Sequence, residues 1–169
     1  MTIKDLKTLY DYSYWANKKL FDVIEQIPEE DFTKPIAGSY ESIRNTMVHI
    51  LSAEWGWLDR CGGPARPNRL IAENYPTIAS LINTWHNVEG YVRAFLGNLE
   101  DADLERQIEY TGSGNMKRSM PLGELLQHTA NHAVHHRAQV ALLLRMLGHT
   151  PGNIDILFYF AEQRGVSAW

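Results

Sequence analysis

Apolar residues recur at helical spacing in five segments of the chain, which together span most of its length. We expect four long helices and one short one, at about residues 3–27, 40–61, 78–99, 121–147 and 154–163. Pro28 ends the first segment, and Pro76 precedes the third, where a proline near a helix start is common. Gly148 is the expected C-terminal cap of the fourth segment, because glycine adopts the left-handed conformation in which many helices end.

Two stretches between these segments lack helical periodicity. Residues 61–70, CGGPARPNRL, are rich in turn formers and predict an irregular loop. Residues 106–120 hold the turn sequence GSGN between two short runs of mixed polar and apolar residues, which predicts a β-hairpin. The pattern therefore predicts an all-α fold, a four-helix bundle with a small β-hairpin before the fourth helix and a short C-terminal helix. The loops are long, so the pattern does not fix the order in which the helices run up and down.

Composition and charge exclude several classes of protein. The 169 residues are 44% hydrophobic and 21% charged, which fits one globular domain over residues 1–169. The net charge of −4 and the lack of a basic stripe argue against nucleic-acid binding. No segment approaches the roughly 18 consecutive apolar residues of a membrane span, and the N-terminal residues lack the apolar region of a secretory signal. Cys61 is the single cysteine, which excludes an internal disulfide and fits a reducing compartment, so we expect a cytoplasmic protein without a membrane partner.

Four of the seven histidines lie within residues 127–139, QHTANHAVHHRAQ, of the fourth segment. On a helix, His132 and His136 are one turn apart and differ by only about 40° around the axis, so both imidazoles can reach one metal ion. His128 and His132 have the same spacing, so spacing alone leaves both pairs open, whereas His135 points about 60° away from His132. Burying unpaired polar groups on the inward face of a bundle is costly, and a metal ion satisfies several of them at once.

A further histidine, His49, lies in the second segment on a face of small and polar residues, which are Ser42, Asn45, Ala53 and Gly56. Small neighbours would let another group approach its imidazole closely. The rest of this segment is apolar nearly all round, which indicates burial on several sides. Taken alone, His49 fits an ordinary buried histidine that bonds a backbone carbonyl better than it fits a metal ligand.

Four segments carry a resemblance to a known family. They are YSYWANKKL at residues 12–20, IRNTMVHILSAEWGWL at 43–58, LLQHTANHAVHHRAQVALLLRMLG at 125–148 and PGNIDILFYF at 151–160. Over nearly its whole length the chain resembles the DinB/YfiT-like family of metal-dependent enzymes, whose most specific motif is NHxxxHR followed by a glutamine. The resemblance implies an up-down-down-up bundle that is frequently a homodimer. It also implies kinship with enzymes that transfer low-molecular-weight thiols, including bacillithiol and mycothiol.

The resemblance further implies the ligands of the metal ion, which are His49, His132 and His136. This assignment decides against His128, and it places His135 where the family often has another aromatic residue. Ala138 departs from the glycine that commonly follows the arginine in the family. We expect that difference to be a small change in packing.

Three neutral imidazoles suit Zn²⁺ or Ni²⁺, and also Fe²⁺. Three protein ligands leave a position open, which is the pattern of a catalytic rather than a structural zinc site. An ion there would lower the pKa of water or of an incoming thiol, making hydroxide or thiolate available near neutral pH. The candidates for side chains around the ligands are Asn45, His128, Arg137 and Gln139. Arg137 would hold a carboxylate of the thiol co-substrate, with a solvated helix residue or a structural ion pair as the alternative.

Three functions therefore stay open. The first is an S-transferase that joins a low-molecular-weight thiol to an electrophilic small-molecule substrate. The second is a metal-dependent hydrolase, and the third is a non-catalytic metal-binding protein of the stress response, in which the ion holds two helices together. A lone loop cysteine such as Cys61 is expected to be inert. Trp55 and Trp57 are expected to pack in the core, with a pocket wall as the alternative.

Overall fold

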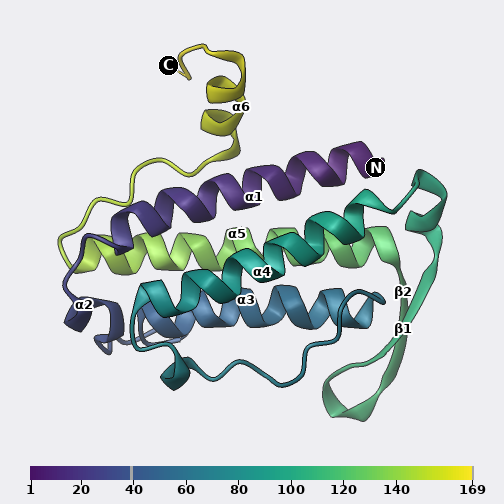
Figure 1. The fold of residues 1–169 in the computed structure, drawn as a ribbon, viewed down its shortest axis with the longest axis horizontal. Helices are drawn as coiled ribbons and strands as arrows, with labels where there is room; N and C mark the ends of the chain where they lie inside the picture. Colours follow the sequence, from purple (N-terminus) through teal and green to yellow (C-terminus); the bar gives the residue numbers. More distant parts are fainter. Residues whose placement is uncertain (39, 169) are drawn as a thin grey trace.

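The computed structural model describes residues 1–38 and 40–168, apart from the side chain of Ser113, and helices make up most of it (Figure 1). The four long helices are α1 (Ile3–Ile24), α3 (Ile43–Arg60), α4 (Ile78–Gly97) and α5 (Leu122–Met146). The short helices are α2 (Glu29–Thr33) and α6 (Ile156–Arg164), with 3-10 turns at η1 (Ala72–Asn74), η2 (Asp101–Glu105) and η3 (Ser113–Asn115). The antiparallel strands of the hairpin are β1 (Gln107–Thr111) and β2 (Lys117–Pro121). These elements confirm the predicted fold class, the hairpin before the last long helix and the short C-terminal helix.

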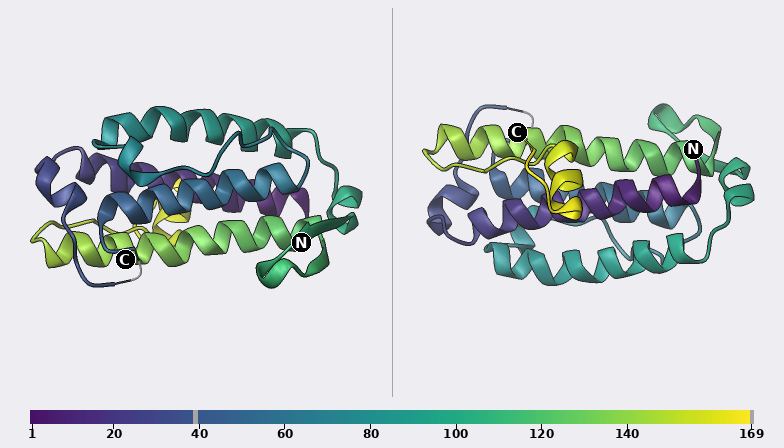
Figure 2. Two further views of the ribbon diagram at one scale, coloured as in Figure 1. Left: turned by 90° about the horizontal axis from the view of Figure 1, so that it is seen from below. Right: turned by 90° about the horizontal axis from the view of Figure 1, so that it is seen from above.

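The four long helices form a bundle in which α1 and α5 run in one direction and α3 and α4 in the other (Figure 1). This is the up-down-down-up order that the family resemblance implied. Because α3 and α4 run in parallel, the chain between them, residues 61–77, has to return along the length of the bundle, and it does so past α3 (Figures 1 and 2). The helices α3 and α5 are antiparallel and make the most extensive contact of any two elements, which we call the α3–α5 seam.

Side-chain caps set the starts of three of the long helices, α1, α3 and α4. The amide of Asn45 donates a hydrogen bond to the Ser42 hydroxyl at 3.0 Å, which caps the start of α3. The prediction that this helix begins near Tyr40 is therefore wrong by a few residues. Glu41 has a φ of 62°, which is left-handed and outside the helical range. Tyr40 thus lies before α3, in the connection that leads into it.

The connection between α1 and α3 contains the short helix α2, which the sequence analysis missed. Five residues are too few to show a periodic pattern, although Pro28 and the acidic residues that follow it are typical of a helix start. The helix α1 ends at Ile24 rather than at Ile27. The amides of Gln26 and Ile27 bond carbonyls three residues back, which tightens the last turn and ends the regular helix.

The main core lies between the four long helices. Among its buried side chains are Leu6, Leu20, Met47, Leu51, Trp85 and Leu144. The Trp85 ring meets Phe21 edge-on with 5.1 Å between centroids, which joins α4 to α1. In the described part of the chain, no helix combines the length and the apolar character that crossing a membrane requires.

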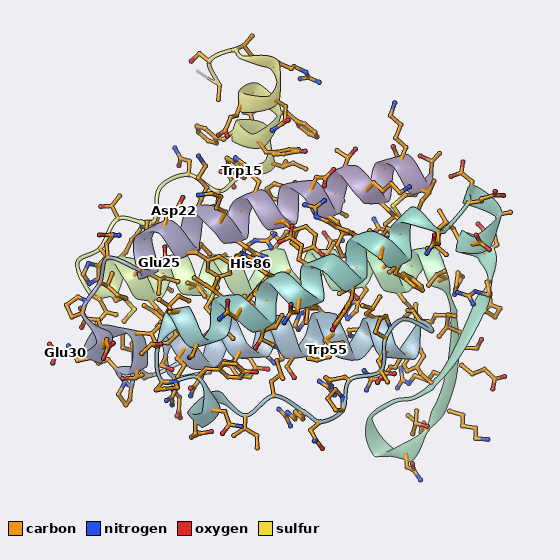
Figure 3. All side chains as sticks on the ribbon, in the orientation of Figure 1. Trp15, Asp22, Glu25, Glu30, Trp55 and His86 are labelled. Atoms are coloured by element: carbon orange, nitrogen blue, oxygen red, sulfur yellow. The ribbon has the colours of Figure 1, made fainter. Side chains whose placement is uncertain are left out.

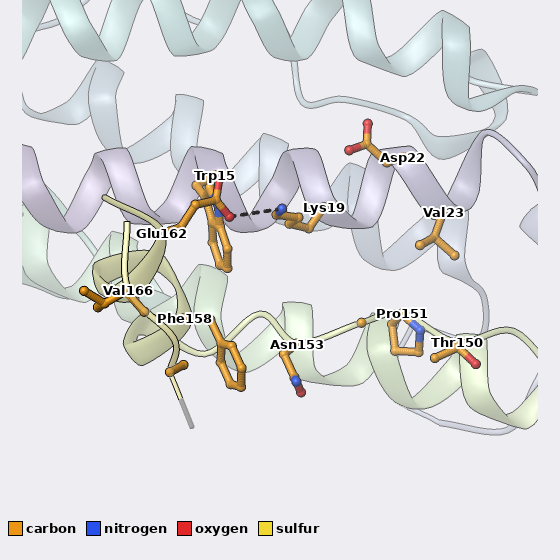
Figure 4. Close-up of a pocket in the computed structure, with 13 residues that line it drawn as sticks. Trp15, Lys19, Asp22, Val23, Thr150, Pro151, Asn153, Phe158, Glu162 and Val166 are labelled. Carbon is orange, nitrogen blue, oxygen red and sulfur yellow. Dashed lines mark ion pairs between the residues drawn. The ribbon is translucent and has the colours of Figure 1, made fainter. Parts of the chain in front are cut away.

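The helix α6 lies outside the bundle, beside α1 (Figures 1 and 2). A small cluster of Tyr12, Ala16 and Tyr159 joins the two helices, and Lys19 pairs with Glu162 at 3.2 Å (Figure 4). A hollow of about 570 Å³ lies between α1 and the C-terminal residues (Figure 4). No histidine lines this hollow, so the candidate chemistry lies elsewhere in the fold.

Candidate metal centre

Three imidazoles meet in the α3–α5 seam. His49 comes from α3, and His132 and His136 come from successive turns of α5. The Nε2 atom of His132 lies 3.1 Å from Nε2 of His49 and 3.1 Å from Nε2 of His136. One ligand nitrogen of each ring lies within 4.8 Å of the other two. The fold thus brings together the histidine pair that helical spacing allowed and the third histidine that the family resemblance added.

Helix geometry explains this convergence. The four-residue spacing puts His132 and His136 on one side of α5, and the antiparallel packing of the seam sets His49 opposite them. His136 is buried, with 6% of its surface exposed, whereas His49 and His132 are half-buried. The rings therefore lie at the edge of the core, where they are partly shielded from water but accessible from one side.

The sequence analysis expected small residues such as Gly56 to let another group approach this side of α3. At Gly56 that group is the side chain of the loop residue Arg66, and not a residue of α5. A Cβ atom at Gly56 would lie 3.1 Å from Nη1 of Arg66. Nη1 of Arg66 donates to the carbonyl of Ser52 at 2.7 Å and to its hydroxyl at 2.8 Å. These bonds hold the loop of residues 61–77 against the outer side of α3.

The electrostatic environment keeps the three imidazoles neutral near pH 7. Burial lowers the pKa of His49 to about 4, with smaller contributions from His136 and Arg69. Burial also lowers the pKa of His132 to about 4, assisted by the neighbouring histidines. The pKa of His136 is lowered by burial against the opposing effect of its hydrogen bond to Gln139. Neutral rings present the lone pairs that a metal ion requires.

Gln139 orients the ring of His136 from behind. Nδ1 of His136 donates to Oε1 of Gln139 at 2.7 Å, so Nε2 of the same ring carries the lone pair. The amide nitrogen of Gln139 donates in turn to Nε2 of His135 at 3.2 Å. Contacts of this kind hold a metal-binding imidazole in one tautomer, so Gln139 lies where the sequence analysis expected a supporting side chain.

The donor set fits a divalent ion. With bonds of about 2.0–2.1 Å to each nitrogen, two ligands would be separated by about 2.9–3.4 Å, depending on whether the geometry is octahedral or tetrahedral. Both 3.1 Å separations fall in this range. Within residues 1–38 and 40–168, these three residues form the one group of histidine, cysteine and carboxylate side chains arranged to hold a metal ion.

Tyr40 is a neighbour of the centre that sequence reasoning missed. Its ring stacks on His49 with 4.0 Å between centroids, and its hydroxyl lies 3.0 Å from Nε2 of His49. The ring also meets His136 edge-on at 5.4 Å. Tyr40 reaches this position because Glu41 turns the backbone at φ 62° and the amide of Ser42 donates to the carbonyl of Tyr40 at 2.8 Å. No sequence signal separated this tyrosine from the seven others in the chain.

A cleft of about 380 Å³ gives access to the His49 side of the centre. Tyr40, Asn45 and Ser52 line it together with Arg69. The Oδ1 atom of Asn45 accepts a hydrogen bond from Nε of Arg44 at 3.2 Å. Asn45 is therefore close to the centre, as expected, but its side chain is engaged by its neighbour on α3.

The other two expected neighbours of the ligands lie further away. The exposed ring of His128 packs edge-on against Trp57 at 5.4 Å and lies 5.9 Å from the His132 ring, between centroids. Arg137 is 1% exposed, and its Nη1 donates to the Ser13 hydroxyl at 2.7 Å on α1. The expectation that Arg137 meets a carboxylate of a co-substrate does not fit this position, because its guanidinium faces the core rather than the centre.

The remaining reactive side chains lie apart from the three ligands. Cys61 is buried at the end of α3, and burial raises the pKa of its thiol to about 11, which fits the expected inert cysteine. His86 is exposed on α4 (Figure 3). His149 follows α5 and lies 2.9 Å from a carboxylate oxygen of Asp31 on α2. None of these side chains extends the centre.

Proteins and structures similar to this chain indicate its family and its fold. The model of the DinB family matches residues 1–165. Protein DinB of Bacillus subtilis (strain 168) is 29% identical over 159 residues, which cover 89% of this chain and 91% of that protein. The uncharacterized protein YizA of the same organism is 23% identical over 150 residues, covering 84% and 87%. The crystal structure of a DinB-like protein from Bacillus cereus ATCC 10987 superposes with a TM-score of 0.75 over 90% of this chain and 97% of that one, at 23% identity, and shares the fold. This chain belongs to the DinB family.

Proposed function

We propose that the protein is a metal-dependent enzyme in which His49, His132 and His136 hold one divalent ion. The observation that carries the proposal is the convergence of three Nε2 atoms from two helices, with two separations of 3.1 Å. Lowered pKa values keep the rings available as ligands, and Gln139 fixes the tautomer of one of them. Three imidazoles suit Zn²⁺, Ni²⁺ or Fe²⁺.

The proposed reaction joins a low-molecular-weight thiol to an electrophilic small molecule. A divalent ion at this position would lower the pKa of a thiol and make the thiolate available near neutral pH. The thiol sulfur forms a bond to the electrophilic carbon, and the thiol proton leaves with the displaced group. The cleft beside His49 supplies side chains that can orient the reactants, namely the Tyr40 hydroxyl and the polar groups of Asn45 and Ser52. This part of the proposal rests on the family kinship that the sequence resemblance implies.

Elemental analysis tests the ion and its ligands. The purified protein should contain about one equivalent of metal, and His49→Ala, His132→Ala and His136→Ala should each lose most of it. The control is His86→Ala, which removes an exposed histidine on α4 and should keep the full content. A full equivalent of metal in all three ligand variants would contradict the assignment.

A rate measurement tests the reaction. The metal-loaded protein is incubated with cysteine or another small thiol and 1-chloro-2,4-dinitrobenzene, and thioether formation is followed against His132→Ala. Rates equal to the uncatalysed reaction with every thiol would overturn the transferase, and release of 4-nitrophenol from a nitrophenyl ester would point to the hydrolase instead. A sharp fall in melting temperature on chelation, without activity of either kind, would assign the ion a structural role.

We also propose that two copies of the chain associate, as the resemblance implies. The helix α5 offers a row of exposed residues at four-residue spacing, which are Val134, Ala138, Leu142 and Met146. A continuous apolar row of this kind is more typical of an interface than of a solvated helix face. Light scattering after size-exclusion chromatography should give twice the chain mass of 19.3 kDa, and Leu142→Glu should give the mass of one chain.

A further inference from the structure

A second pocket of about 620 Å³ lies between the end of α3, the start of α5 and the hairpin. Its apolar wall consists of Trp57, Tyr110, Met120 and Leu125. Its polar side chains are the guanidinium groups of Arg60 and Arg118, the imidazole of His128 and the hydroxyl of Thr111. Carboxylates are absent from the lining, so the pocket joins aromatic surface to positive charge.

The two arginines have no acidic partner among residues 1–38 and 40–168. Nη1 of Arg60 donates only to the carbonyl of Gly56, at 3.1 Å, and its guanidinium lies over the Trp57 ring at 4.9 Å. Within the described part of the chain, the side chain of Arg118 makes no hydrogen bond and no ion pair. Unpaired guanidinium groups around one pocket, in a chain with a net charge of −4, mark a local anion site.

The hairpin is built to present one of these arginines. Arg118 on β2 pairs with Tyr110 on β1, so both side chains emerge from the same face of the hairpin. Glu109, the neighbouring carboxylate, emerges from the opposite face. A Cβ atom at Gly112 would lie 3.0 Å from Nε of Arg118, so glycine at this position leaves room for the arginine side chain.

The pocket adjoins the candidate metal centre. His128 forms its wall on α5 and lies one helical turn, or about 6 Å, before His132. Its ring packs against Trp57 at 5.4 Å and approaches the ring of His132 to 5.9 Å, between centroids. The pocket is therefore separated from the nearest proposed ligand, His132, by the ring of His128, and none of the three ligands lines it.

We propose that this pocket binds an anionic aromatic small molecule. Arg60 and Arg118 hold its carboxylate or phosphate, and Trp57 and Tyr110 contact its ring. We further assign this molecule as a substrate of the metal centre, a step that rests on the proposed function. A polyanion such as nucleic acid would need a long basic stripe, whereas the unpaired charge here is confined to one pocket.

Calorimetric titration of the purified protein tests the pocket directly. The probes are 2-naphthoate and 2-naphthyl phosphate, with neutral 2-naphthamide and ring-free inorganic phosphate as controls. Arg60→Gln and Arg118→Gln should each weaken binding of the anionic probes by about tenfold or more, because each removes a charge-assisted hydrogen bond. Arg145→Gln, which changes an exposed arginine at the far end of α5, should leave the affinity unchanged.

Several results would overturn the proposal. They are equal affinity for 2-naphthamide, equal affinity for inorganic phosphate, and unchanged binding in the Arg60→Gln, Arg118→Gln double variant. Repeating the titration on His132→Ala separates the pocket from the centre. If His132→Ala loses the metal but still binds the probes in a way that depends on Arg60 and Arg118, the pocket is supported independently of the centre. The assignment of the three metal ligands is tested separately, by the metal content of the variants.

Discussion

Glu54 allows a test of how burial in the core changes the pKa of a carboxyl group and, through it, the stability of the protein. Its carboxyl lies on α3 with 6% of its surface exposed, and the Tyr14 hydroxyl donates to Oε1 at 3.2 Å. Within the described residues Oε2 has no hydrogen-bond partner. Burial raises the pKa of Glu54 from 4.5 to about 7, although the positive charge of Arg137 opposes this shift. The native state therefore keeps a proton on Glu54 that the unfolded chain releases.

The sign and size of the effect on stability follow from this difference. Between pH 4.5 and about 7 the native state binds more protons than the unfolded state, so the free energy of unfolding falls as the pH rises. The loss amounts to about 1 kcal/mol at pH 5 and about 3 kcal/mol at pH 8, where it levels off. Glu54→Gln keeps an oxygen acceptor for Tyr14 and cannot ionise. It should therefore gain about 2.5 kcal/mol of stability relative to the wild type between pH 5 and pH 8.

Urea denaturation at pH 5 and pH 8, with chelator present throughout, measures this gain. Glu124→Gln is the matched control, because Glu124 is an exposed residue of α5 and its replacement should change stability equally at both pH values. A difference between wild type and Glu54→Gln that stays constant within about 0.5 kcal/mol would refute the reasoning. It would mean that Arg137 and Tyr14 stabilise the carboxylate enough to keep its pKa near the usual value.

Three further predictions concern the centre and the loop after α3. Gln139→Ala should weaken metal binding by about 10- to 100-fold while leaving the folded structure intact by circular dichroism, because it removes the acceptor that orients His136. Gly63→Ala should destabilise the protein by about 1–3 kcal/mol, since the new Cβ would lie 2.6 Å from Cγ of Leu58, whereas Gly90→Ala has open space and should not destabilise it. Zn²⁺ affinity should change little between pH 7 and pH 6, because two of the ligands have pKa values of about 4, and a steep loss of affinity over that interval would contradict the neutral rings described above.

Periodicity predicted the long helices well because each one buries a continuous apolar face. It failed where local backbone geometry decides the boundary. The start of α3 depends on the left-handed Glu41 and on the cap provided by Ser42, and neither changes the apolar pattern around Tyr40. The short helix α2 was not predicted, because a helix of five residues is too short to show a periodic apolar pattern.

The candidate centre was only partly predictable for a different reason. Spacing along α5 is local information, and it limited the ligands to two overlapping pairs that share His132. The third histidine comes from another helix, and only the family resemblance placed it. Tyr40 and the arginines of the second pocket come from a loop, a helix end and a hairpin. Their meeting depends on tertiary packing that no pattern along the chain encodes.

The bundle contains two clusters of polar side chains, and the contacts of each cluster indicate a different role. In the core, Arg137 donates to Ser13 and Asn17 of α1, and its positive charge partly offsets the rise that burial causes in the pKa of Glu54. Those groups face one another between helices, an arrangement that specifies which helices pack together. The histidines of the seam instead turn three neutral nitrogens towards one point beside an accessible cleft. Three ligand nitrogens that converge beside an accessible cleft are what a bound cation requires, and this contrast with the core group is the basis of the proposed metal site.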